Sequence, residues 1–335
     1  MSKRLGKRTT VLDNAVYIGA YSAVVGPKEA EGPMAEYFDR AFQDEFLGQS
    51  SFEKAESKLQ QISVQTTLQK ASVSASDVDM IFAGDLLNQC IGSAYGLREL
   101  EIPFVGLYGA CSTMALSLIL ASMAVEGGTA DKAVAVTSSH FCSSERQFRF
   151  PLEYGGQRPP TAQWTVTGSG SVLLNRSLKG TRVNSFTVGK IVDLDVTDMN
   201  NMGAAMAPAA ADTISSFLAD TGTAPSDYDL ILTGDLGFTG SDLMLSILKK
   251  QGIILPNHND CGMMIFDRER QDVHSGGSGC GCSASILCSY VLQKMAAGEI
   301  QNVLFCATGA LMSPTACMQG ESIPSIAHLL HLTAK

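Results

Sequence analysis

The feature that most constrains the fold of this chain is an internal repeat. Residues 76–86 are Ser-Asp-Val-Asp-Met-Ile-Phe-Ala-Gly-Asp-Leu, residues 226–236 are Ser-Asp-Tyr-Asp-Leu-Ile-Leu-Thr-Gly-Asp-Leu, and more than half of the positions are identical. Each copy contains a polar turn, a short apolar run rich in β-forming residues and a Gly-Asp-Leu end, which together predict a buried strand. The two halves of the chain therefore contain the same local unit.

The segments that follow the repeat also recur in the same order. Cys111 and Cys280 each precede an apolar stretch of small residues that predicts a helix, and β-rich runs follow at residues 132–137 and 302–308. Self-similarity on this scale predicts two related α/β halves packed about a pseudo-twofold axis. It argues against a solenoid, in which the repeats are shorter and more numerous.

Length and composition fit two such halves, which we place at residues 1–178 and 179–335. The chain has 335 residues, of which 45% are apolar, and this is enough to bury one large core or two coupled cores. The net charge of −9 argues against nucleic acid as a partner and against adhesion to anionic lipid.

The cysteines and the hydropathy pattern indicate a cytoplasmic chain. Nine cysteines, with no apolar segment behind the basic residues 3–8, predict free thiols in a reducing compartment and no secretory signal. Residues 102–125 carry no charge and are long enough to mimic a membrane span. Because Pro103, Gly106 and Gly109 interrupt this stretch, we expect a strand followed by a buried helix and no transmembrane segment.

The most specific chemical signal is Cys111, which lies in Gly109-Ala110-Cys111-Ser112-Thr113. The segment stands between an expected strand at 102–108 and an expected helix at 114–125. A sharp turn from a strand into a helix presents a nucleophile in several enzyme folds, and the helix N-terminus directs N–H groups at the sulfur. We therefore expect Cys111 to be a buried nucleophile position that favours the thiolate.

Two other patterns leave alternatives open. The segment 139–158 is rich in cationic and aromatic residues, and it is either a solvated loop or a lid that binds an anion through its arginines. Cys280 and Cys282, with Cys261 and His258 upstream, suggest a metal site. Their spacing differs from the two-residue gap of zinc sites, so we expect no metal.

The duplicated halves, the Gly-Ala-Cys-Ser turn and the Thr-Gly-Ser-Gly-Ser segment resemble the thiolase superfamily, which includes the ketoacyl-acyl-carrier-protein synthases. The resemblance implies a five-layered αβαβα fold, usually dimeric, with a nucleophilic cysteine at the start of a central helix. Longer stretches resemble one thiolase-like family of endospore-forming bacteria, stage V sporulation protein AD. These stretches are residues 83–89, 145–149, 153–157, 205–212 and 276–280.

That second resemblance implies a function. The family is associated with binding dipicolinic acid (pyridine-2,6-dicarboxylate), with its uptake into the forespore and with its release in germination. Expected partners are dipicolinic acid, with or without calcium, a second copy of the chain, and other proteins of the same sporulation locus, including membrane channel components. The expected location is cytoplasmic and peripheral at the forespore or inner spore membrane. No cofactor is expected.

Departures from the enzyme pattern argue against catalysis. Thiolases and ketoacyl synthases place a histidine in the loop after the second central strand, where this chain has Asp235 in Gly234-Asp235-Leu236. A second histidine or asparagine follows a glycine at the mirror helix, where this chain has Cys280. Such groups typically contribute about 10²–10⁴-fold to rate. We expect a non-catalytic homologue, with an acyltransferase that uses Cys111 as the alternative.

The expected ligand site gathers residues around the start of the central helix. Asp85 and Asn88 follow the first repeated strand, and strand ends in such folds converge on the helix start. Cationic side chains on the segment after the next strand would face the carboxylates of the ligand. The full predicted set is Cys111, Asp85, Asn88, His140, Arg146, Arg149, Asp235 and Cys280.

Overall fold

We describe the fold from a computed structural model, which covers residues 2–148, 158–177 and 179–334. Ten of the described strands form two matched sets of five. The first set is β2 (Thr9–Val25), β4 (Met80–Gly84), β5 (Phe104–Gly106), β6 (Lys132–Ser139) and β8 (Gly168–Asn175). The second set is β9 (Thr181–Thr187), β10 (Leu230–Thr233), β11 (His258–Asp260), β13 (Asn302–Ala310) and β14 (Ser325–Thr333).

The two sets have the same topology. They join where β2 pairs with β9, and outward from this seam the orders are β2-β8-β6-β4-β5 and β9-β14-β13-β10-β11. Each strand therefore has a counterpart at the same place in the sheet and in the same chain order. The predicted duplication is confirmed. The proposed boundary at residue 178 falls in the connection between β8 and β9, and it stays a prediction because residue 178 lies outside the described residues.

The repeated sequence makes repeated hydrogen bonds. The carboxylate of Asp79 accepts from the backbone N–H of Lys132 at 3.0 Å, and that of Asp229 accepts from Asn302 N–H at 2.9 Å. Asp79 directly precedes β4 and holds the start of its parallel neighbour β6. Asp229 directly precedes β10 and holds the start of β13 in the same way. The Asp-x-Asp motif of the repeat therefore fixes strand register in each half.

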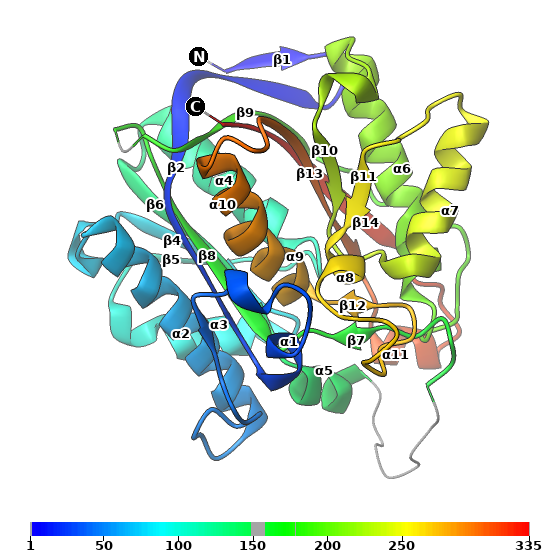
Figure 1. Cartoon of the computed structure of the whole chain (residues 1–335), viewed down its shortest axis with the longest axis horizontal. Coiled ribbons are helices and arrows are strands. Elements are labelled where there is room, and N and C mark those ends of the chain that lie inside the picture. Colours follow the sequence, from blue (N-terminus) through cyan, green and yellow to red (C-terminus); the bar gives the residue numbers. More distant parts are fainter. Residues whose placement is uncertain (1, 149–157, 178, 335) are drawn as a thin grey trace.

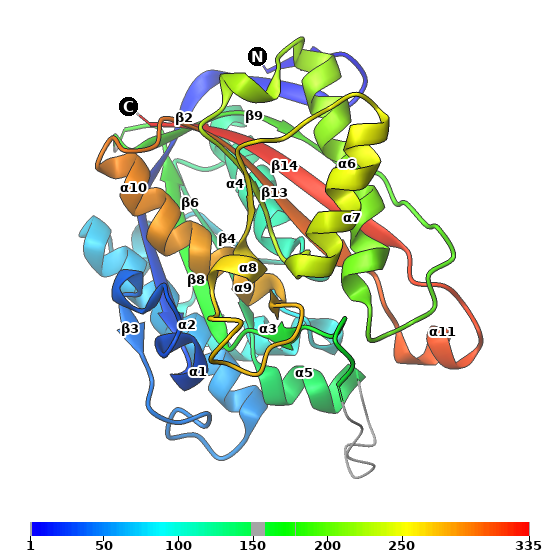
Figure 2. The same cartoon turned by 45° about the vertical axis from the view of Figure 1, so that its right-hand side comes forward.

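Helices complete five layers (Figures 1 and 2). One outer layer covers the first set of strands, the other covers the second, and the central layer lies between them, so the predicted αβαβα order is confirmed. The outer helices are α2 (Phe52–Ala71) and α3 (Ile91–Leu97) on one side, and α6 (Met202–Thr221) and α7 (Gly237–Lys250) on the other. The central helices are α4 (Thr113–Gly127), α9 (Cys280–Ile286) and α10 (Leu292–Ala296).

The central layer is the core of the protein. Met114 and Leu118 of α4 pack in one cluster with Leu174 of the first set of strands and Phe305 of the second. Residues 110–127 are apolar and long enough to cross a membrane, but 78% of that segment is buried inside the fold. The apolar segment is therefore explained by burial on all sides, as expected from its sequence.

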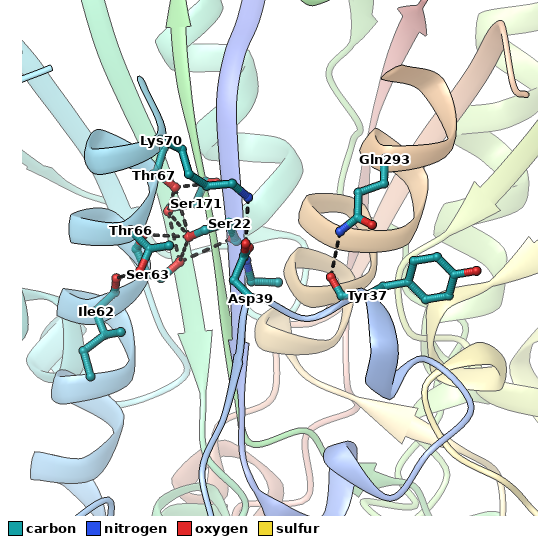
Figure 3. A network of polar contacts seen from close by, with 11 residues as sticks. Ser22, Tyr37, Asp39, Ile62, Ser63, Thr66, Thr67, Lys70, Ser171 and Gln293 are labelled. Atoms are coloured by element: carbon teal, nitrogen blue, oxygen red, sulfur yellow. Dashed lines mark hydrogen bonds and ion pairs between the residues drawn. The ribbon is translucent and has the colours of Figure 1, made fainter. Parts of the chain in front are cut away.

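Small hydroxyl side chains let α2 lie close to the sheet (Figure 3). Ser63 and Thr67 of α2 meet Ser22 of β2 and Ser171 of β8, and all four are fully buried. Ser22 Oγ donates to the Ser63 carbonyl at 2.7 Å, and Thr67 Oγ1 bonds Ser22 Oγ at 3.0 Å. Because each hydroxyl finds a partner, this polar layer can be buried without leaving unsatisfied groups.

The remaining described strands and α-helices are short. Two of them, β7 and β12, pair in parallel beside the central helices and carry residues of the functional site. They and the others are β1 (Lys3–Leu5), β3 (Arg40–Ala41), β7 (Trp164–Thr165), β12 (Gly277–Ser278), α1 (Pro27–Ala30), α5 (Phe141–Phe148), α8 (Cys261–Met264) and α11 (Pro314–Met318).

Candidate functional site

The turn at Cys111 forms as the sequence predicts. Ala110 adopts a left-handed φ of +50°, an uncommon conformation for a residue with a Cβ atom, and α4 begins three residues later. The turn is held by Ser112 Oγ, which donates to the Gly109 carbonyl at 2.6 Å, and by Thr113 Oγ1, which donates to the Ala110 carbonyl at 2.6 Å. These bonds fix the turn that precedes the helix, where Cys111 lines a cavity.

Gly309 of β13 closes the turn from the other half. A Cβ atom at this position would overlap the Gly109 carbonyl oxygen and lie 3.0 Å from the backbone nitrogen of Ser112. The second half can therefore reach the Cys111 turn because this residue has no side chain.

Cys111 lines a small apolar cavity of about 40 Å³, which has room for roughly three water molecules. Its walls come from both halves. The described lining residues include no lysine, arginine or histidine, and its polar groups are hydroxyls and one carboxylate. The lining residues are Leu86, Tyr108, Ala110, Cys111, Ser144, Glu145, Phe148, Thr165, Met202, Ser278, Ala310 and Met312.

Asp235 lies beside Cys111 and hydrogen-bonds its thiol. The carboxylate hydrogen-bonds the thiol, accepts from Gly279 N–H at 2.9 Å and accepts from Thr308 Oγ1 at 2.7 Å. Burial and then the Asp235 charge raise the pKa of Cys111 well above its usual value. The expected thiolate is therefore wrong: desolvation and a neighbouring carboxylate outweigh the helix N-terminus, and Cys111 is a thiol.

Cys280 lies at the start of α9 and packs against Cys111 and Leu86. Its thiol donates to the Ser138 carbonyl at 3.0 Å. Burial raises its pKa well above the usual value, with Glu56 as the next cause. The two cysteines at the starts of α4 and α9 are thus neighbours, as their matched positions predict, and burial favours the thiol form of both.

Asp85 is buried and is not among the described residues that line the cavity. Its carboxylate accepts from Leu87 N–H at 2.9 Å and from the Ser93 N–H and hydroxyl at 2.8 and 2.6 Å. These bonds hold the turn that leads into α3. Burial raises the pKa of Asp85, against the lowering effect of the Ser93 bonds.

Asn88 and Arg146 face a different hollow, on the surface beside α2 and α3. Arg146 forms an ion pair with Glu53, and Asn88 N–H donates to the Gln147 side chain at 2.9 Å. Neither lines the cavity at Cys111. Arg149, the other predicted arginine, lies outside the described residues.

His140 is also placed away from the cavity. It is fully buried, its Nε2 lies 2.8 Å from the Glu45 carbonyl, and its ring packs near Phe52. Burial lowers its pKa, which favours the neutral ring and removes it as a cation. The structure therefore brings Cys111, Asp235 and Cys280 together. The other predicted residues that it describes, Asp85, Asn88, His140 and Arg146, are not among the described lining residues of the cavity.

The five histidines of the chain are all described, and none lines the cavity. His258, which could have folded back into the site, instead bonds Thr233 Oγ1 at 2.9 Å. The others make contacts elsewhere: His274 with Asp272, His328 with Gly189 N–H, and His331 with the ring of Tyr228.

Sequence reasoning missed most of the cavity wall. Ser144 and Phe148 come from α5, a helix where the sequence suggested a loop, and Thr165 and Ser278 come from the β7–β12 pair. Helical spacing of residues 141, 144, 145 and 148 was an available signal for α5. Met202 and Met312 come from distant parts of the second half, and no local pattern marks them.

Comparisons with known proteins agree with this architecture. The model of one family, described as stage V sporulation protein AD, matches residues 6–333. The stage V sporulation protein AD of Bacillus subtilis (strain 168) is 45% identical over 327 residues, which is 97% of this chain and 96% of that protein.

Solved structures of condensing enzymes share the fold at low sequence identity. The 3-oxoacyl-[acyl-carrier-protein] synthase III from Aquifex aeolicus VF5 has a TM-score of 0.56 and 10% identity over 95% of this chain and 99% of that one. A variant of OleA from Xanthomonas campestris has a TM-score of 0.62 and 10% identity over 96% of this chain and 99% of that one. The fold is therefore thiolase-like.

Proposed function

Because the chain belongs to the stage V sporulation protein AD family, a family of sporulation proteins, we propose that it binds dipicolinic acid in the cavity beside Cys111. It then supports uptake of dipicolinic acid into the forespore and its release in germination. The observation that carries the proposal is the cavity itself: it is apolar, lies between the two halves at the start of α4, and contains hydroxyl groups. Such a site suits a flat aromatic ring with polar substituents.

The charges at the cavity indicate the form of the ligand. Dipicolinate carries two carboxylates, whereas Asp235 and Glu145 place carboxyl groups beside and within the cavity. No lysine or arginine is among the described lining residues. Two carboxylates brought close to these groups would repel them unless a cation or protons accompany the ligand. We therefore propose the calcium complex of dipicolinate as the preferred ligand.

The size of the cavity requires side chains to move. A volume of about 40 Å³ is far below that of a typical ligand site. Met202 and Met312 line it, and methionine side chains are flexible enough to repack around a ring. Ligand entry is therefore coupled to displacement of these two residues.

The raised pKa of Cys111 supports a binding role over catalysis. Burial and the Asp235 charge both disfavour the thiolate that would attack a thioester, and none of the histidines lines the cavity. The second candidate, an acyltransferase, is favoured by one observation: Cys111 lines the cavity of a fold shared with condensing enzymes. Intact-mass analysis after incubation with acyl-CoA separates the two. An acyl adduct that is lost in Cys111→Ala would support the acyltransferase.

Calorimetric titration with dipicolinate, with and without calcium, tests the binding role. In Cys111→Trp the indole fills the cavity, so we expect affinity to fall at least tenfold, which corresponds to roughly 1.4 kcal/mol or more. Cys317→Trp is the control, because Cys317 is partly exposed on α11 and is not a cavity residue. If Cys111→Trp folds and binds like the parent, the ligand is not in this cavity.

The proposed partners include a second copy of the chain. All three residues of β5, at one end of the sheet, are exposed, and Phe104, Val105 and Tyr108 present apolar surface there. An exposed apolar edge strand can pair with its own copy and extend the sheet. We also propose membrane proteins of the same sporulation locus as partners, with the chain on the cytoplasmic side of the forespore membrane.

A further inference from the structure

Ser144 on α5 has a buried hydroxyl group that makes no hydrogen bond with the described residues. The residue is 3% exposed, its Oγ has no partner in the described part of the chain, and it lines the cavity beside Cys111. A buried hydroxyl without a partner is unusual, because most buried polar side chains are hydrogen-bonded. The unpaired Oγ therefore indicates a donor that is available to a group bound in the cavity.

The local helix explains why Ser144 lacks an internal partner. A serine in a helix commonly donates to the carbonyl one turn earlier. For Ser144 that carbonyl belongs to His140, and it already accepts Ser144 N–H at 3.1 Å. Ser143 Oγ also lies 3.1 Å from this oxygen, so two neighbouring groups surround it, and Ser144 Oγ makes no bond to it.

The neighbouring serine shows the contrast. The single hydroxyl hydrogen of Ser143 has a nearer acceptor, the Glu56 carboxylate at 2.7 Å, on the side of α5 that faces α2. Successive residues of a helix point in different directions, so Ser143 is bonded within the fold and Ser144 faces the cavity. Thr165 and Ser278 add two more hydroxyl groups to the cavity wall.

We propose that Ser144 positions the ligand by donating its hydroxyl hydrogen to one carboxylate of dipicolinate. The inference rests on the proposed function and names a specific residue for it. A neutral donor fits this cavity, because it adds no repulsion or extra charge beside Asp235 and Glu145. A hydrogen bond to a carboxylate is also stronger than one between neutral groups.

Ser144→Ala tests the proposal against a matched control. Ser122 on α4 is also fully buried, with an Oγ that is unpaired among the described residues, but it does not line the cavity. Both alanine variants remove an unsatisfied hydroxyl and place a good helix former in a helix, so neither should unfold at a lower temperature than the parent. We expect Ser144→Ala to bind calcium dipicolinate roughly ten- to a hundredfold more weakly by calorimetry, and Ser122→Ala to bind like the parent.

Ser144→Cys sharpens the test, because a thiol is a weaker donor of similar size, and we expect intermediate affinity. A merely structural role would change stability and affinity together, whereas this role predicts lost affinity without lost stability. If Ser144→Ala binds like the parent, the inference is wrong and the proposed function stands. If Ser122→Ala weakens binding equally, the effect is not specific to the cavity and the inference is also wrong. If the parent does not bind, both the function and the inference are wrong.

Discussion

Matched cysteines stand at the starts of the central helices α4 and α9, yet only Cys111 is among the described residues that line the cavity. Cys111 lines the cavity, whereas Cys280 is 0% exposed and its thiol bonds the Ser138 carbonyl. The residue of β13 that approaches Cys111 is Gly309, and its counterpart in β6 is Ser139. Ser139 Oγ donates to the Val166 carbonyl at 2.7 Å and accepts from Gly281 N–H at 3.1 Å. At the start of α9 the Ser139 side chain fills the space beside the helix. At the Cys111 turn only the backbone of Gly309 approaches the helix start.

The aspartates that follow the repeated strands β4 and β10 also have different roles in the two halves. Asp85 stabilises the turn into α3, whereas its counterpart Asp235 is directed at the Cys111 thiol. In the second half Asp260 takes over the structural role, accepting from Leu236 and Gly237 N–H at 2.9 Å each. Duplication thus places a carboxyl group at each strand end, and its tertiary neighbours decide whether it supports the fold or the site.

Substitution at Gly309 should have the largest effect on stability. In Gly309→Ala the new methyl group meets the backbone of the Cys111 turn, which cannot move as a flexible side chain could. We expect the free energy of unfolding to fall by about 1–3 kcal/mol, measured by urea unfolding. Dipicolinate affinity should fall as well, because the turn that carries Cys111 shifts.

The matched change in the first half is Ser139→Ala. It removes two hydrogen bonds and introduces no overlap, so we expect a loss of about 1–2 kcal/mol with dipicolinate affinity retained. If both variants lower affinity equally, the two helix starts are coupled to the cavity in the same way, and the comparison fails.

Buried carboxyl groups should make stability depend on pH in both halves. Burial raises the pKa of Glu56 to about 8 and that of Asp260 to about 7. Each folded group keeps a proton that the unfolded chain releases near pH 4–4.5. The stability that each contributes is therefore full at low pH and is lost as pH rises toward the folded pKa. In urea unfolding, Glu56→Gln should lose less stability than the parent between pH 5 and 8.

Asp260→Asn should flatten the profile in the same direction but at a structural cost. Asp260 accepts from three backbone N–H groups and the Thr233 hydroxyl, and an amide keeps only one acceptor oxygen. Glu56 accepts only from Ser138 and Ser143 among the described residues, and their hydroxyls can reorient. We expect Asp260→Asn to be less stable than the parent at every pH. Equal stability at pH 5 would contradict this difference.

The fold could be predicted from the sequence because the two halves repeat the same segments in the same order. The repeat gives the strands β4 and β10 and their Asp79 and Asp229 contacts, and the order of segments gives the central helices that follow Cys111 and Cys280. The expected strand at 102–108 is shorter in the structure, where β5 spans Phe104–Gly106. Residues 102–103 and 107–108 lie outside the strand.

The site was harder to predict because it depends on the direction in which each side chain faces more than on the position of the residue in the chain. Residues 139–158 were expected to supply cations, but α5 turns residues 144, 145 and 148 to the cavity and Arg146 to the surface hollow. A one-residue difference on a helix changes the facing direction by about 100°. The pKa of Cys111 could not be predicted from the sequence either, because its burial beside Asp235 follows from tertiary packing between the halves.

The two outermost strands of the sheet, β5 and β11, give the last comparison. A substitution on β5 is expected to change the stability of the folded chain least. All of β5 is exposed, whereas in β11 Asp260 is buried and His258 and Asn259 are partly covered. If the chain dimerises through an edge strand, β5 is the exposed one.

Val105→Lys places a charge on that apolar edge strand, and natural sheets use such charges to prevent pairing between edges. By light scattering the parent should have twice its chain mass of 35.5 kDa, and the variant should have that mass once. The free energy of unfolding of the monomer should change by no more than about 0.5 kcal/mol, because Val105 is 37% exposed. Asn259→Lys on β11 is the control and should leave the dimer intact. A monomeric parent, or a dimer that survives Val105→Lys and dissociates with Asn259→Lys, would show that the exposed edge is not the interface.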